Sequence, residues 1–177
     1  MNNLFLNSIR MVLFLGLQIY VLNNVPPLHQ FISPIIYYLF LLWLPFSVSR
    51  LGLLFLGFLL GLSIDYFLVT PGLNTAVCLV IAYVRPFLIS VLIPHDKAEF
   101  NFREPSAVAM GWVPYITYVM LLSFLFHGYI SFLEWLQWGG FFDFILKTIS
   151  ATLISTLLAI TSEVLFPRKG KLRSSGR

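Results

Sequence analysis

The sequence has few charged residues and a single cysteine. Only 10% of its 177 residues are charged and 59% are hydrophobic, whereas an ordinary soluble domain carries about 25% charged residues. A water-soluble fold of this composition would expose large apolar patches, which excludes a soluble domain as the main body of the chain. Cys78 alone provides neither a disulfide framework nor a CxxC metal site, and in its apolar run it acts as a small hydrophobic residue.

Catalytic motifs are also lacking. The three histidines fall in separate segments without metal-ligand spacing. The sequence contains no GxSxG nucleophile elbow and no phosphate-cradling loop, and no acidic pair is spaced for glycosyl chemistry. We therefore expect no enzymatic activity, no cofactor and no metal.

Long apolar runs dominate what is present. A membrane-spanning helix needs about 20 mainly apolar residues, and backbone groups in lipid must be hydrogen-bonded within their own segment. The runs also lack the alternation of barrel strands. The sequence therefore predicts an all-α, polytopic membrane helix bundle of about six transmembrane helices over residues 1–166, followed by a basic tail at 167–177. The six runs are 4–22, 28–46, 51–69, 73–93, 107–133 and 141–166.

The distribution of Lys and Arg predicts the orientation. The three loops at 23–27, 70–72 and 134–140 contain no Lys or Arg. The positive-inside rule therefore places them outside and both termini in the cytoplasm. Trp135 and Trp138 would then mark the outer membrane interface, and Trp43 the inner one. The basic residues on the inner side are Arg10, Arg50, Lys97, Arg103, Arg168, Lys169, Lys171, Arg173 and Arg177.

Two cytoplasmic segments carry the remaining charge. The basic tail directly follows an apolar run, so we expect it to contact anionic lipid and not nucleic acid. The connection from 94 to 106 has mixed charges and is too short to fold alone. It is either a docking surface for a cytoplasmic partner or a solvated loop.

The third run carries the most informative pattern. Gly57, Gly61 and Asp65 lie four residues apart and share one helix face. A GxxxG pair lets another helix approach closely. A carboxylate in a membrane segment is costly and needs a partner or a function. Asp65 either caps or pairs within the structure or binds a partner, through hydrogen bonds and not proton chemistry. We expect Asp65→Asn to preserve most of that role.

Arg85 stands inside the fourth run, immediately before Pro86. Proline removes the hydrogen bond to the Ala82 carbonyl, so Arg85 can satisfy freed carbonyls or reach Asp65 on the preceding helix. The two residues differ by about 9 Å in depth on straight helices. Whether they pair is therefore left open.

The last run has small and hydroxylated residues on one side, which indicates packing against other helices or an oligomer seam. One row recurs every four positions and begins and ends with a charged residue: Lys147, Ala151, Ser155, Ala159 and Glu163. Beside it runs a row of threonines: Thr148, Thr152 and Thr156.

With these features placed, the chain resembles the MreD family of bacterial rod shape-determining membrane proteins. The resemblance covers nearly the whole length. It is sharpest at 56–65 (LGFLLGLSID), followed by Pro71-Gly72-Leu73-Asn74. Arg85-Pro86 and the basic tail are also similar. The motif residues that carry over are Gly57, Gly61, Asp65 and Gly72, as a packing and turn motif without chemistry.

The resemblance implies a scaffold of the cell-wall elongation machinery in the bacterial cytoplasmic (inner) membrane. Such a protein helps to maintain rod shape by organising peptidoglycan synthesis. Its implied partners are an MreC-like protein, MreB, RodA and a class B penicillin-binding transpeptidase.

The alternative function is a small-molecule carrier, such as the substrate-binding membrane subunit of a vitamin transporter. Such a subunit needs an aromatic or polar pocket. The fifth run offers Trp112, Tyr115, Tyr118 and His127 for one, although it contains no ligand motif.

Overall fold

Four helices in the computed structural model are long and apolar enough to cross a membrane. The structure describes residues 3–24, 35–93, 104–138 and 140–165, and every regular element within these ranges is helical. The chain is therefore an all-α, multi-pass membrane protein. The predicted basic tail and most of the connection from 94 to 106 lie outside these residues. The four helices are α3 (Arg50–Leu68), α4 (Leu73–Leu92), α6 (Trp112–Trp138, with its apolar span at Trp112–Leu133) and α7 (Phe141–Leu165).

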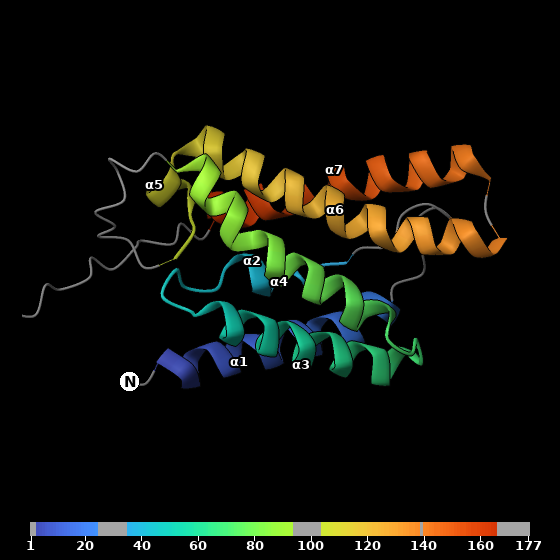
Figure 1. Ribbon diagram of the computed structural model, residues 1–177, viewed down its shortest axis with the longest axis horizontal. Helices are drawn as coiled ribbons and strands as arrows, with labels where there is room; N and C mark the ends of the chain where they lie inside the picture. Colours follow the sequence, from blue (N-terminus) through green and yellow to red (C-terminus); the bar gives the residue numbers. More distant parts are fainter. Residues whose placement is uncertain (1–2, 25–34, 94–103, 139, 166–177) are drawn as a thin grey trace, which may run out of the picture.

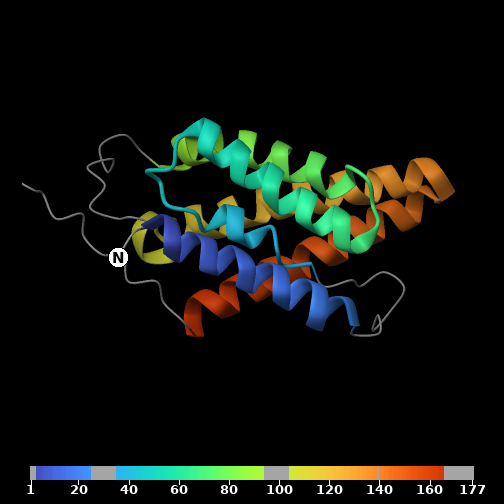
Figure 2. The same cartoon turned by 90° about the horizontal axis from the view of Figure 1, so that it is seen from below.

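The four long helices form two antiparallel hairpins, α3–α4 and α6–α7, which join where α4 packs against α6 (Figures 1 and 2). The turn after α3 and the turn before α7 lie at one end of the molecule. The start of α3, the end of α4, the short helix α5 (Ala107–Met110) and the end of α7 lie at the other. We refer to the second as the α5 end.

The first predicted span becomes three consecutive helical pieces. The helix α1 (Asn3–Gly16) continues into a π-helical turn, Leu17–Val21, and a 3-10 turn, Leu22–Asn24. The change in hydrogen bonding accompanies the inward side chain of Gln18, which is 2% exposed. Its Oε1 accepts a hydrogen bond from the Ile36 backbone N–H at 2.9 Å. The uninterrupted α-helix is thus 14 residues long and is not one of the four spans.

The predicted helix at 28–46 is wrong over its described part. From residue 35 to 49 the only α-helix is α2 (Leu39–Leu42), which lies among the long helices (Figure 2). Prolines at 34 and 45 bound the run and oppose one continuous helix. The side chains from Tyr37 to Leu42 are each at most 3% exposed, and irregular backbone is tolerated at membrane depth where protein encloses it. The expected count of six spanning helices is therefore not supported: four helices among the described residues are long and apolar enough to cross a membrane.

Glycines bring α3 against α4. A Cβ added at Gly61 would overlap the backbone of Thr75 and lie 2.7 Å from the Asn74 carbonyl oxygen. A Cβ at Gly57 would lie 3.0 Å from the Cys78 carbonyl oxygen. At these two positions helix α4 occupies the space that a side chain would need.

The connection between these helices also requires unusual backbone angles. Val69 has φ 56° and Gly72 has φ 82°, both in the left-handed region that glycine adopts without cost. A β-branched residue there is rare, so Val69 indicates that the turn is held by the helices on either side.

We predict that Gly61→Ala destabilises the protein by about 1–3 kcal/mol, because the new methyl group has to push the α4 backbone away. Gly16→Ala is the matched control, since nothing lies within 4 Å of a Cβ at that position. The check is the thermal unfolding midpoint of each purified variant in detergent. Equal midpoints for the two variants would mean that α3 and α4 separate at no cost.

Candidate functional site

The carboxylate of Asp65 lies at the end of α3, against the first turn of α4. Its Oδ1 accepts hydrogen bonds from the Asn74 backbone N–H at 2.9 Å, the Asn74 side-chain amide at 3.0 Å and the Thr70 hydroxyl at 2.9 Å. Its Oδ2 accepts from the Thr75 backbone N–H at 2.8 Å and the Thr75 hydroxyl at 2.6 Å. Asp65 is 5% exposed, so these bonds replace water almost completely.

This geometry makes Asp65 the cap of the following helix. The first N–H groups of a helix have no partner within it, and Gly72, at the N-cap of α4, has no side chain to offer. Asp65 supplies the acceptor from the neighbouring helix, and its negative charge is stabilised by the positive end of the α4 dipole. The hydrogen bonds fix the ends of two antiparallel helices to each other.

The hydrogen bonds around Asp65 extend, through Asn74, to the irregular segment between residues 35 and 49. Asn74, which donates to Asp65, accepts a hydrogen bond from the Tyr37 hydroxyl at 2.5 Å. Asn74 also donates to the Thr70 hydroxyl at 2.8 Å. The sequence pattern drew attention to Asp65, but nothing in its spacing pointed to Tyr37.

Arg85 is 2% exposed and binds the far end of that segment. Its Nη2 donates to the carbonyl of Leu44, and its Nε donates to the Tyr118 hydroxyl at 3.1 Å. That hydroxyl in turn donates to the carbonyl of Leu42 at 2.9 Å. Arg85 therefore binds one backbone carbonyl, that of Leu44 in the segment after α2, which is not a carbonyl freed by Pro86. Neither a hydrogen bond nor an ion pair joins Arg85 to Asp65, whose two oxygens accept from residues of the turn and of α4.

A second set of buried polar residues joins Tyr38, at the N-cap of α2, to α6, and α6 to α7. The Tyr38 hydroxyl shares a hydrogen bond with the Ser123 hydroxyl at 2.7 Å, and His127 Nε2 is 2.8 Å from the Ser155 hydroxyl. The Tyr38 ring stacks on Phe126 at 4.2 Å. The side of α7 predicted to pack is the buried one, apart from Lys147, which is only partly buried. Its buried residues are Thr148, Ala151, Thr152, Ser155, Thr156, Ala159 and Glu163.

The residues considered for a carrier pocket do not form one together. Tyr115, Tyr118 and His127 are at most 3% exposed, whereas Trp112 is 50% exposed. Tyr118 and His127 already have hydrogen-bond partners inside the bundle. Within the described ranges, no group of three or more His, Cys, Asp or Glu side chains could hold a metal ion.

We predict that Asp65→Asn destabilises the protein, contrary to the expectation from sequence. An amide keeps one acceptor oxygen, so its NH2 group must face either the Asn74 and Thr70 donors or the Thr75 donors. Leaving buried donors unsatisfied costs roughly 1–3 kcal/mol. Asp65→Leu removes every acceptor and is expected to cost at least as much.

The measurement is again the unfolding midpoint in detergent, with Ser63→Ala as the control. Ser63 lies two residues away on α3, and its hydroxyl bonds only to its own helix, at the Leu59 carbonyl. A wild-type midpoint for Asp65→Asn would show that the carboxylate is not needed as a double acceptor.

Comparison with known proteins assigns no family to this chain. No protein-family model, no curated protein and no solved structure matches it. Its function has to be inferred from its own residues and their geometry.

Proposed function

We propose that this chain is a non-enzymatic membrane scaffold of the bacterial cell-wall elongation machinery. It would help to maintain rod shape by holding together the proteins that insert peptidoglycan. The observation that carries the proposal is the use of Asp65 and Arg85, the two buried charged residues of the α3–α4 hairpin, to hold the fold together.

Charged residues inside membrane segments often mark ion or substrate pathways. Here Asp65 has five hydrogen bonds to the α3–α4 turn and the first turn of α4. Arg85 is bound to Tyr118 and to a backbone carbonyl. A carrier needs polar groups that can exchange their partners for a ligand. Groups committed in this way favour a bundle of fixed shape, which suits a platform for other proteins.

The residues that resemble the MreD family form one structural unit, and this supports the same proposal. Gly57 and Gly61 admit α4, Asp65 caps it, and Gly72 makes the turn between the two helices. The resemblance thus falls on a packed hairpin. We propose an MreC-like protein as the partner, within a complex containing MreB, RodA and a class B penicillin-binding transpeptidase.

We further propose that the α5 end faces the cytoplasm of a bacterial inner membrane. The start of α3 and the end of α7 both lie at this end (Figure 1). Arg10 of α1 forms an ion pair there with Glu104, at 2.8 Å. The basic residues of the connection after α4 and of the tail follow helices that end there, so we propose the same side for them, and the positive-inside rule places that side in the cytoplasm.

Reporter fusions test this orientation. We expect fusions after Lys97 and at the C-terminus to report a cytoplasmic location, and a fusion near Gln137 to report an external one. An external C-terminus would invert the topology.

Depletion of the protein in the bacterium that encodes it tests the function. If the chain organises lateral wall synthesis, rods are expected to widen and round up as its level falls. A wild-type copy should restore the rods, and a tagged copy should co-purify an MreC-like protein. Gly61→Leu, which separates α3 from α4, should fail to restore shape.

The carrier alternative predicts a different outcome. If the chain is a carrier, cells depleted of it should remain rod-shaped. The purified protein should also release a small molecule on denaturation, which mass spectrometry of the extract would detect. Unchanged cell shape together with a stoichiometric small ligand would overturn the scaffold proposal.

A further inference from the structure

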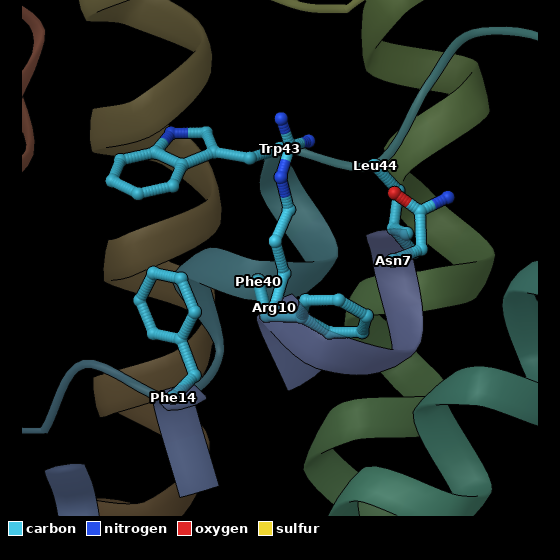
Figure 3. A pocket seen from close by; sticks show the side chains of 6 residues that line it. All are labelled: Asn7, Arg10, Phe14, Phe40, Trp43 and Leu44. Atoms are coloured by element: carbon cyan, nitrogen blue, oxygen red, sulfur yellow. The ribbon is translucent and has the colours of Figure 1, made fainter. Parts of the chain in front are cut away.

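A pocket of about 190 Å³ lies between α1 and the segment around α2 (Figure 3). Its lining combines two polar side chains with aromatic rings. In Figure 3 the side chain of Arg10 lies between the Phe14 and Trp43 rings on one side and Asn7 and Leu44 on the other. The lining residues are Asn7, Arg10 and Phe14 of α1, with Phe40, Trp43 and Leu44.

The polar residues keep hydrogen-bonding capacity. A guanidinium carries five N–H donors, and Arg10 uses one of them to bind Glu104 at 2.8 Å. The Arg10 side chain is 44% exposed. Among the described residues, neither its other donors nor the Asn7 amide has a partner. Asn7, Arg10 and Phe14 lie three and four residues apart, so they share one face of α1.

The apolar residues make a fixed wall. The Phe14 and Trp43 rings meet edge to face with centroids 5.6 Å apart, and Phe40 and Leu44 are 3% and 1% exposed. Arg10 lies about 10 Å along the helix from Asn3, the first described residue of α1. Arg and Trp side chains near a helix end are typical of the level of the lipid headgroups.

The volume limits the occupant. Small-molecule sites usually enclose about 300–1,000 Å³, so this pocket is too small for the substrate of a carrier. It holds roughly six waters at about 30 Å³ each, which is enough for a phosphate and its glycerol. Beyond the rings lie the exposed side chains of Leu13 of α1 and Leu17 of the π-helical turn (65% and 45%), an apolar surface suited to acyl chains.

We propose that this pocket binds the headgroup of an anionic phospholipid. The phosphate is held by Arg10 and Asn7, the glycerol lies against Phe14 and Trp43, and the acyl chains remain in the bilayer. None of the residues that line the site belongs to the basic tail, which we expect to attract anionic lipid through its charge.

The test titrates the full-length protein in detergent with phosphatidylglycerol and measures the Kd of the first bound lipid by native mass spectrometry. We expect Arg10→Gln to raise that Kd about fivefold, the loss typical of one basic residue near an anionic surface. Phosphatidylcholine, whose headgroup has no net charge, should bind more weakly and respond less. Every variant retains the basic tail, so any attraction of the tail for anionic lipid is the same in all of them.

Two controls separate the pocket from other effects. Glu104→Gln breaks the ion pair but leaves the guanidinium in place, so it should bind phosphatidylglycerol at least as tightly as the wild type. Arg50→Gln removes an exposed charge at the α5 end that does not line the pocket and should leave the Kd unchanged. The unfolding midpoint of each variant confirms that it is folded.

The proposal fails if Arg10→Gln binds phosphatidylglycerol like the wild type, or if Arg50→Gln weakens binding as much. If Glu104→Gln weakens phosphatidylglycerol binding as much as Arg10→Gln does, the loss of affinity comes from breaking the ion pair and not from removing a lipid ligand. Glycerol 3-phosphate serves as the soluble probe. If it displaces the lipid at a comparable concentration, the site takes free phosphate compounds and not a membrane lipid.

Discussion

Residues 35–49 lie within an apolar bundle without forming a continuous helix. Some of their backbone groups bond to one another, and others must find partners on other elements. A buried N–H or C=O without a partner costs as much as a lost hydrogen bond, and water is excluded here. Gln18 of the π-helical turn accepts a hydrogen bond from the Ile36 N–H. Arg85 and Tyr118 bind the carbonyls of Leu44 and Leu42. Three polar side chains from three different helical elements thus make the irregular segment possible.

The Asp65 group solves a related problem at the other end of the bundle. There the unsatisfied groups are the first N–H donors of α4, and a carboxylate from α3 accepts them. Tyr37 connects this end to the irregular segment through Asn74. The polar residues in the interior therefore form a sparse framework that positions the helices. The close contact at Gly57 and Gly61 supplies the packing between them.

Hydropathy predicted α3, α4, α6 and α7 because a long apolar run in lipid has one stable backbone solution, the helix. It misread the described part of the run at 28–46, from residue 35 on, because hydropathy measures apolar content and cannot tell a side chain facing lipid from one enclosed by protein. Pro34, Pro45 and the adjacent tyrosines Tyr37 and Tyr38 were the local signals of an interrupted segment.

The candidate site was predictable to a similar extent. The four-residue spacing placed Gly57, Gly61 and Asp65 on one helix face, and a capping role for Asp65 was one reading of its place before a turn. The sequence could not predict that both Asp65 oxygens accept hydrogen bonds from the first turn of α4, since this depends on where α4 begins. The partner of Arg85 was missed for a different reason. The comparison of depths along straight helices considered only Asp65 as a partner. The Leu44 carbonyl that Arg85 binds belongs to a segment that was expected to be helical.

The hydrogen bonds from Arg85 and Tyr118 to the irregular segment also constrain the order in which the protein can fold. Leu44 precedes Arg85 by 41 residues, and Leu42 precedes Tyr118 by 76. At about 5–20 residues per second of synthesis, the second of these partners emerges roughly 4–15 s after the carbonyl it will bind. Until then the carbonyls of Leu42 and Leu44 lack these partners, and leaving them unpaired in hydrocarbon would be costly. The segment can therefore complete these hydrogen bonds only after α4 and α6, which follow it in the chain, have been made.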